Sequence, residues 1–170
     1  MRLRKAAAVI SPVTVRIARP DDERALGRLG AMLVAEHHDF DPKRFIAPMP
    51  ELPQRYGAFL VSQIGKPGML VLAAERDGAL VGYAYAGMEG SDYMALRGPA
   101  GVLYDLVVDP GHRRQGVGSA LLGAALAALR QLGAPRALLF TAEKNEAARA
   151  MFAKAGFRQT MIEMTLELGA

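Results

Sequence analysis

The sequence predicts one α/β domain in which a mixed central sheet of about six to seven strands is flanked by about four helices. Of the 170 residues, 51% are hydrophobic and 22% are charged, a composition that can bury one substantial core. Short apolar stretches with a period of two alternate along the chain with longer stretches whose apolar residues recur every three or four positions. Because no internal repeat or linker divides the chain, we expect a single domain over 13–170 after a flexible leader over 1–12.

The first 64 residues predict a strand and two helices. The strand is expected over 13–18, where apolar and polar residues alternate. Pro20 ends this strand, and a helix with an apolar stripe follows to about His38. Pro42 breaks that helix. After a proline-rich connection, a short helix is expected over 54–64.

The middle of the chain predicts a hairpin and a further strand. Two apolar strands over 69–75 and 80–87 flank Asp77-Gly78, and an Asp-Gly pair between strands is a strong hairpin signal. A loop with several glycines follows, and a fourth strand is expected over 102–108. The hairpin strands should therefore be antiparallel neighbours.

The last third of the chain predicts a helix, a strand, a helix and a final strand. An alanine- and leucine-rich helix over 116–132 is followed by a short buried strand over 136–141. Asn145 caps the next helix, which Gly156 ends. The final strand, over 160–168, alternates apolar and polar residues and could pair with a second copy of the chain. A homodimer is thus left open.

Composition excludes several classes of protein. The chain has no cysteine, so it has neither a disulfide scaffold nor a cysteine nucleophile. A net charge of +4 favours acidic ligands, yet no basic run indicates a nucleic-acid partner. No stretch reaches the roughly 18 to 20 apolar residues that a membrane span needs, and the apolar run over 6–10 is too short for a signal peptide. We therefore expect a cytoplasmic protein.

A loop rich in glycine and N–H donors joins the strand over 102–108 to the next helix. Free N–H groups and the positive end of the helix dipole attract phosphate, and glycine lets the backbone approach it. The alternative is a glycine-softened turn with solvated arginines. The candidate phosphate-binding residues are Arg113, Arg114, Gln115, Gly116, Val117, Gly118 and Ser119.

Two motifs together resemble a known family. Arg113-x-x-Gly116-x-Gly118 is similar to the acyl-coenzyme A binding signature of the GCN5-related N-acetyltransferase (GNAT) superfamily. The segment over 145–157 resembles the second motif of that family, an Asn, then Ala, then an aromatic residue, then Lys-x-Gly-Phe. The pair is far more specific than either motif alone.

The resemblance implies the acyl-CoA N-acyltransferase fold, with acetyl-CoA as co-substrate in a splay between the fourth and fifth strands. The pyrophosphate would lie on the loop over 113–119. The pantetheine arm would meet the backbone of Leu106, Val107 and Val108 and the helix residues Asn145 and Phe152.

For the chemistry we name Asp105 as the base that orients or deprotonates an amine, at a position where polyamine-type relatives carry an acid. It is expected on the same strand face as Leu103 and Val107, and the alternative is a carboxylate that only pairs with an arginine. Phe152 stands where the family commonly has a tyrosine general acid, so Tyr104 or a water would take that role.

The first hypothesis is thus an acetyl-CoA-dependent N-acetyltransferase that acts on a small cationic amine in a ternary complex. The alternatives are a non-catalytic acyl-CoA binding or regulatory module, a protein N-terminal or lysine acetyltransferase, and, more weakly, a dinucleotide binder. No metal site is expected, because the adjacent His37 and His38 point about 100° apart on a helix and lack a third ligand.

Overall fold

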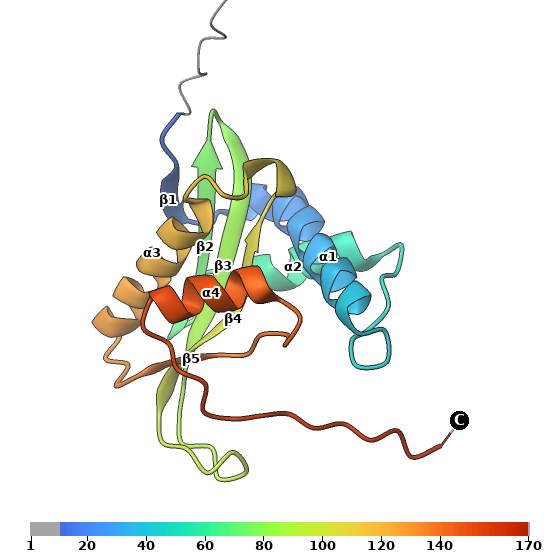
Figure 1. Ribbon diagram of the computed structural model, residues 1–170. Helices are drawn as coiled ribbons and strands as arrows, with labels where there is room; N and C mark the ends of the chain where they lie inside the picture. Colours follow the sequence, from blue (N-terminus) through green and yellow to red (C-terminus); the bar gives the residue numbers. More distant parts are fainter. Residues whose placement is uncertain (1–10, 170) are drawn as a thin grey trace, which may run out of the picture.

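The computed structural model describes residues 11–169, which form a five-stranded sheet covered by helices on both faces (Figure 1). The sheet order is β1-β2-β3-β4-β5, with antiparallel pairing from β1 to β4 and parallel pairing of β4 with β5. The expected leader over 1–12 lies for its larger part outside the described residues. The elements are β1 (Thr14–Ile17), η1 (Pro20–Asp22), α1 (Glu23–Phe40), α2 (Leu52–Gln63), β2 (Met69–Arg76), β3 (Ala79–Glu89), β4 (Ala100–Val108), η2 (Pro110–His112), α3 (Val117–Gln131), β5 (Ala137–Leu139) and α4 (Glu146–Lys154).

The α/β class and the predicted hairpin are confirmed. β2 and β3 pair antiparallel around Asp77 and Gly78, whose φ angles are 50° and 76°. Positive φ at both central residues is what a two-residue hairpin turn requires, which is why Asp-Gly predicts it. The four predicted helices are present, with ends shifted by a few residues.

The predicted strand over 160–168 is wrong, and the sheet has five strands instead of six or seven. This segment is extended but pairs with no strand of residues 11–169, and its side chains are exposed. An alternating pattern describes a strand with one buried face, but it does not say which sheet edge the strand joins.

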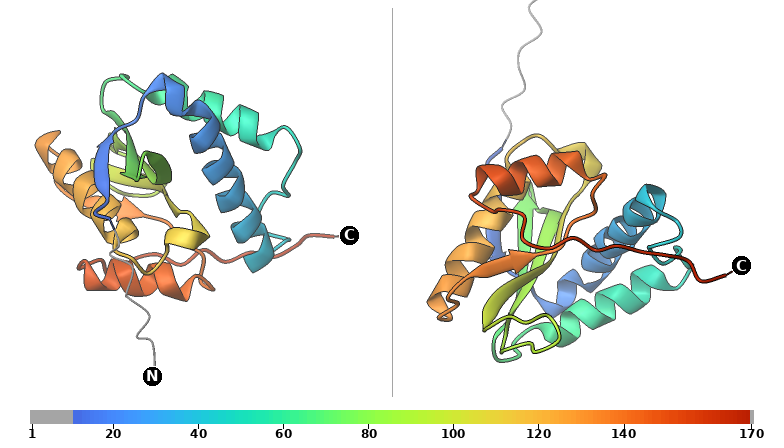
Figure 2. Two further views of the ribbon diagram at one scale, coloured as in Figure 1. Left: turned by 90° about the horizontal axis from the view of Figure 1, so that it is seen from above. Right: turned by 60° about the horizontal axis from the view of Figure 1, so that its bottom comes forward.

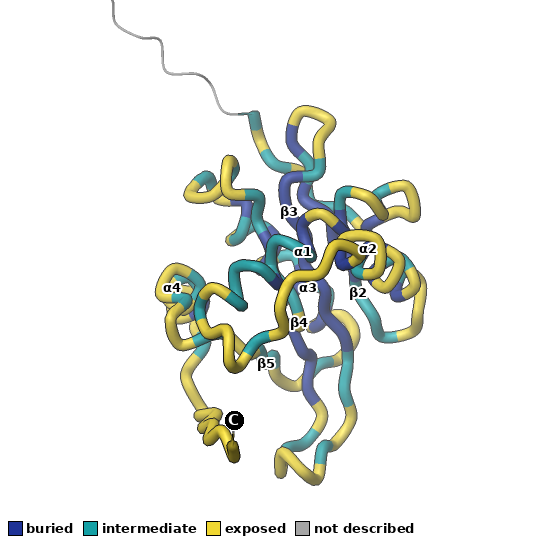
Figure 3. Tube along the Cα trace, turned by 90° about the vertical axis from the view of Figure 1, so that its right-hand side faces the viewer, coloured by how far each residue is buried: buried dark blue, intermediate teal, exposed yellow. Residues whose placement is uncertain are grey.

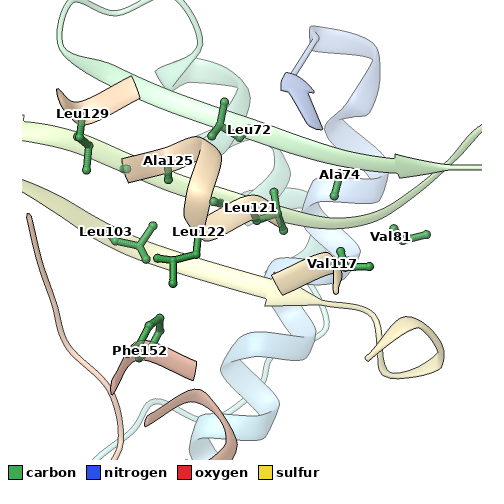
Figure 4. Close-up of a cluster of buried hydrophobic side chains, with 12 residues drawn as sticks. Leu72, Ala74, Val81, Leu103, Val117, Leu121, Leu122, Ala125, Leu129 and Phe152 are labelled. Carbon is green, nitrogen blue, oxygen red and sulfur yellow. The ribbon is translucent and has the colours of Figure 1, made fainter. Parts of the chain in front are cut away.

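The helices divide between the two faces of the sheet (Figure 2). One buried cluster joins β2, β3 and β4 to α3 and to Phe152 of α4, and it includes the fully buried Leu121 and Leu129 of α3 (Figure 4). The other joins the same strands to α1 and α2 through Leu26, Leu29 and Leu60. The central strand β3 therefore holds the longest run of buried residues within 11–169, from Val81 to Gly87 (Figure 3).

The backbones of α1 and α2 touch where they cross. A Cβ at Gly27 would lie 1.9 Å from the carbonyl oxygen of Pro53, and a Cβ at Gly57 would lie 2.5 Å from that of Glu23. A Cβ at Gly30 would lie 2.2 Å from the Tyr56 ring. The crossing therefore brings Tyr56 close against α1 and onto the face of the sheet that carries the candidate site.

Candidate functional site

A β-bulge in β4 organises the candidate site. Tyr85 of β3 pairs with Asp105, and the next residue, Ala86, pairs with Leu103, so Tyr104 has no partner on β3. A bulge of this kind directs two consecutive side chains to the same face of a sheet. Tyr104 and Asp105 both lie on the face that α1 and α2 cover, as their contacts with Tyr85, Tyr56 and Tyr83 demonstrate.

The bulge corrects one expectation. Asp105 shares its face with Val107, as predicted, but Leu103 packs in the opposite cluster, against α3. Strict alternation along β4 would have placed all three residues together. The extra residue at the bulge reverses the alternation, which the sequence pattern alone does not reveal.

Asp105 is hydrogen-bonded to two tyrosines. Its Oδ2 accepts a hydrogen bond of 2.7 Å from the Tyr56 hydroxyl and one of 2.9 Å from the Tyr83 hydroxyl. Burial raises the pKa of Asp105, although both tyrosines and the nearby His37 lower it in part. The pKa values of Tyr56 and Tyr83 are raised, chiefly by burial and then by the charge of Asp105. Burial thus favours the protonated form of the carboxyl, which lies beside two phenols that stay protonated at neutral pH.

Tyr104 lies in an aromatic cluster beside a carboxylate. Its ring centroid is 4.8 Å from that of Tyr85, and the Phe59 ring meets Tyr85 edge-on at 5.6 Å. The Tyr104 hydroxyl donates to Glu89 at 2.8 Å, and Glu89 also pairs with Arg97. Burial, followed by Glu89, raises the pKa of Tyr104, so this phenol keeps its proton at neutral pH. Aromatic rings next to a carboxylate can hold a cation.

β4 and β5 separate beside the bulge. Their pairing covers only Gly101 to Leu103 with Ala137 to Leu139. From Tyr104 to Val108, β4 has no neighbour on the β5 side among residues 11–169, so the predicted splay is present. An unpaired strand edge can hydrogen-bond the amides of an extended ligand.

The loop that follows β4 leads into α3 with its N–H groups uncapped. Gly116, at the N-cap position with a φ of 82°, offers no side-chain acceptor. The N–H groups of Val117, Gly118 and Ser119 begin the helix, where no intrahelical acceptor exists. This end of α3 can bind an anion.

Most of the polar side chains predicted to bind phosphate contact protein groups. Arg113 forms two hydrogen bonds of 2.9 Å with Glu36 of α1, and its Nε donates to the carbonyl of Val108 at 3.0 Å. Gln115 accepts from Arg76 and donates to the carbonyl of Gly111. Arg114 has a positive φ of 61°. The loop thus presents mainly backbone to a ligand.

Asn145 and Phe152, the two residues of the second motif that were predicted to meet the pantetheine arm, stabilise α4. The Asn145 side chain caps α4 by accepting from the Ala148 N–H at 3.1 Å. The ring of Phe152 is 8% exposed and packs against Phe157 with centroids 5.9 Å apart. Having no hydroxyl, Phe152 cannot supply a proton.

The two histidines of α1 are hydrogen-bonded to backbone. Nδ1 of His37 lies 2.8 Å from the carbonyl of Leu33, and Nδ1 of His38 lies 3.2 Å from that of Phe45. Within residues 11–169, no group of three or more His, Asp or Glu residues is placed to hold a metal ion. None of the helices in the same range has the length and apolarity to cross a membrane.

Nothing in the sequence pattern indicates that Tyr56 and Tyr83 meet at Asp105. Tyr83 is fully buried with its hydroxyl on Asp105. The available signal for the close approach of α1 and α2 was their glycines, Gly27 and Gly30 in α1 and Gly57 in α2. Small residues permit a close helix crossing.

Comparison with known proteins gives three further findings. The model of a family described as the acetyltransferase (GNAT) family matches residues 30–157. The chain is 38% identical over 95 residues to a mycothiol acetyltransferase from Thermobispora bispora, a match that covers 54% of this chain and 30% of that protein. Across the curated relatives that it matches, the chain spans from 28% to 48% of the relative's length.

Solved structures share the fold at low sequence identity. A mutant of the BH1408 protein from Bacillus halodurans superposes with a TM-score of 0.78 at 19% identity, covering 91% of this chain and 99% of that one. An aminoglycoside N-acetyltransferase, AAC(6')-Iy, solved in complex with CoA, has a TM-score of 0.66 at 17% identity, covering 95% and 97%.

Proposed function

The chain belongs to the acetyltransferase (GNAT) family, and on that premise we propose that it transfers an acetyl group from acetyl-CoA to the primary amine of a small cationic molecule. The observation that carries the proposal is the position of Asp105. This carboxylate, bonded to two tyrosines, lies at the bulge of β4, where β4 also separates from β5.

Acetyl-CoA would bind on the opposite side of the bulge from the amine. The uncapped N–H groups at the start of α3 would hold the pyrophosphate, together with the loop over 113–119. The backbone of Leu106, Val107 and Val108 would pair with the amides of the pantetheine arm along the free edge of β4. These groups suit such a ligand, because phosphates need N–H donors and the arm needs a strand edge.

The reaction that we propose is a direct transfer in a ternary complex. The amine nitrogen attacks the thioester carbonyl carbon, a C–N bond forms and the C–S bond breaks. Asp105 takes the proton that the amine loses, directly or through the Tyr56 hydroxyl, and the thiolate takes a proton from Tyr104 or from water. Because Phe152 stands where the family commonly has a tyrosine, this position has no hydroxyl to protonate the thiolate.

The aromatic cluster around Tyr104 supports a cationic acceptor. Tyr104 and Phe59 are partly exposed on either side of the buried Tyr85, and Glu89, which also pairs with Arg97, lies beside Tyr104. Curated relatives are named mycothiol acetyltransferases, so a mycothiol-type small molecule joins polyamines, amino sugars and amino acids among the candidate acceptors.

A non-catalytic acyl-CoA binding module is the second candidate, and Phe152 is the observation that favours it. Calorimetric titration with acetyl-CoA, followed by a panel of primary amines, separates the two functions. We expect one site per chain and release of free thiol when the correct amine is added. Binding without thiol release across the panel would favour the module, and an absence of binding would refute both.

Replacement of Gly118 by valine is expected to lower acetyl-CoA affinity by about tenfold or more. A Cβ there would lie 3.1 Å from Sδ of Met151 and 3.6 Å from Val108, so the larger side chain would fill the space between β4, α3 and α4. The measurement is calorimetry, with a thermal melt to verify folding. Gly123→Val on the same helix, where nothing lies within 4 Å, is the control. Equal affinity in the two variants would mean that the loop is misassigned.

The rate is expected to depend on the ionisation of Asp105. Because burial raises the pKa of this carboxyl above its ordinary value of 3.8, the acidic limb of kcat/KM should lie above that value. A raised carboxyl pKa also means that stability falls as the pH rises through the window between the unfolded and folded pKa values. A pH profile of kcat/KM and denaturant titrations at several pH values test the two effects. The Asp105→Asn variant should show neither the acidic limb nor this pH dependence of stability. A limb that persists in this variant would assign it to another group.

A further inference from the structure

Arg76, the last residue of β2, is a buried cation without a carboxylate beside it. Its side chain lies in the interior, and the residue is 6% exposed. Within residues 11–169 its guanidinium forms no salt bridge, and its Nε is buried without a hydrogen-bond acceptor. A buried charge that lacks a counter-ion destabilises the free protein. The stability of the fold therefore does not explain why an arginine occupies this position.

The hydrogen bonds that Arg76 does form both end on Gln115, in the loop before α3. Its Nη1 donates to the side-chain oxygen of Gln115, and its Nη2 donates to the backbone carbonyl at 3.4 Å. The side-chain nitrogen of Gln115 donates in turn to the carbonyl of Gly111 at 3.1 Å. The loop crosses the hairpin end of β2 and β3 (Figure 1), where the Asp109 N–H donates to the carbonyl of Val81 at 2.9 Å. The hairpin thus holds both ends of this loop.

The bond to the Gln115 carbonyl also sets the direction of the next N–H group. Residues 11–169 contain no cis peptide bond, and in a planar trans peptide group the C=O and the N–H point in opposite directions. Because the Gln115 carbonyl is turned toward the buried Arg76, the N–H of Gly116 is turned away from it. Gly116 is the N-cap residue of α3, directly before the uncapped N–H groups of that helix. Arg76 therefore orients the backbone where the proposed phosphate site begins.

The charge of Arg76 acts at the same place. A guanidinium stays protonated at all ordinary pH values, and salt screens a buried charge less than an exposed one. Arg113, on the outside of the loop, is paired with Glu36 at 2.9 Å. Arg76 is instead a positive charge behind the loop that no carboxylate of residues 11–169 neutralises. A phosphate bound on the loop would supply the missing negative charge.

We propose that Arg76 is a positioning residue for acetyl-CoA. Through Gln115 it holds the loop over 109–116 in the form that accepts the pyrophosphate, and its charge favours that anion. The inference rests on the proposed function, since it assumes that this loop binds a pyrophosphate. Arg76 itself touches no ligand, because it lies behind Gln115. The side chain of Gln115 accordingly serves the protein side of the loop.

Arg76→Met is expected to lower the affinity for acetyl-CoA about tenfold or more. Methionine keeps an unbranched apolar side chain in the interior but loses the charge and both hydrogen bonds to Gln115. Calorimetry measures the affinity, at a temperature well below the melting point of each variant. Arg16→Met is the matched control, because Arg16 on the neighbouring strand β1 pairs with Asp22 and Glu75 instead of the loop. Equal affinities in the two variants would overturn the proposal.

A double-mutant cycle with Gln115→Ala shows whether Arg76 acts through Gln115. Each single variant should weaken the binding of acetyl-CoA, and the double variant should bind no more weakly than Arg76→Met alone. Additive losses would mean that the two residues act separately and would refute the positioning role. Gln115 is only half-buried, so Gln115→Ala tests the contact even if Arg76→Met does not fold. An unchanged affinity in Gln115→Ala would also refute this role.

A co-substrate without phosphates separates positioning from a general loss of structure. S-Acetylpantetheine has the thioester and the arm of acetyl-CoA but no pyrophosphate. In Arg76→Met, kcat/KM for acetyl-CoA should fall, whereas kcat/KM for S-acetylpantetheine should stay within about twofold of its original value. Equal losses for the two compounds would make the role of Arg76 purely structural.

The unaltered protein distinguishes failure of this inference from failure of the proposed function. If it binds no acetyl-CoA, the proposed function is refuted and this inference with it. If it binds acetyl-CoA and Arg76→Met binds equally well, only the role of Arg76 is refuted.

Discussion

Asp105→Asn is expected to lower kcat by about a hundredfold or more while leaving the affinity for acetyl-CoA unchanged. A general base typically accelerates a reaction by about 10² to 10⁴, and the amide that replaces the carboxylate cannot take a proton. The asparagine keeps the size of the side chain and can still accept hydrogen bonds from Tyr56 and Tyr83. The measurement is steady-state turnover of the best amine found, with calorimetry for acetyl-CoA.

The matched control is Asp77→Asn. Asp77 lies in the β2–β3 turn with a φ of 50°, a conformation that asparagine tolerates as well as aspartate. The Asp77→Asn variant should turn over the amine at the rate of the unaltered protein. If both variants were equally active, Asp105 would have no part in the chemistry. If Asp105→Asn lost acetyl-CoA binding as well, its role would be structural.

Gly27→Ala is expected to destabilise the fold by about 3 kcal/mol, at the upper end of what overpacking a core costs. The new Cβ would meet the backbone oxygen of Pro53 at 1.9 Å, so the two helices must move apart. A backbone atom cannot turn aside as a flexible side chain can. Chemical denaturation measures the loss.

Gly123→Ala should change the free energy of unfolding in the opposite direction. Gly123 lies inside α3 with nothing within 4 Å of the added Cβ, so alanine should stabilise the protein by about 0.5–1 kcal/mol. Equal stabilities for the two variants would mean that α1 and α2 are farther apart than the structure has them.

Most of the fold could be predicted from the sequence because its signals are local. Three signals each specify a backbone conformation by themselves: the turn at Asp77-Gly78, the helix cap Asn145, and Gly116 before α3. The bulge at Tyr104 could not be predicted, since nothing in an apolar strand distinguishes a bulged residue from a paired one. The strand expected over 160–168 failed for a related reason, as pairing depends on a partner far away in the sequence or in another copy.

The sequence offers Asp105 and Tyr104 as candidate residues, and their roles stay predictions, but it does not give their connections. Asp105 was named from the family resemblance, whereas its bonds to Tyr56 and Tyr83 join three elements that no local pattern relates. The expectation that Arg113 is available to phosphate did not anticipate its pairing with Glu36, 77 residues earlier in the chain.

Two ion pairs tie α1 to the loop before α3, Arg28 with Asp109 at 2.7 Å and Glu36 with Arg113 at 2.9 Å. An anion that engages Arg113 must compete with Glu36, and so it must loosen one of the two tethers. The helix released in this way carries Gly30 and His37, which border Tyr56 and Asp105. We therefore expect the affinity of the loop for an anion to be linked to the position of α1, and salt that screens both ion pairs should weaken this linkage.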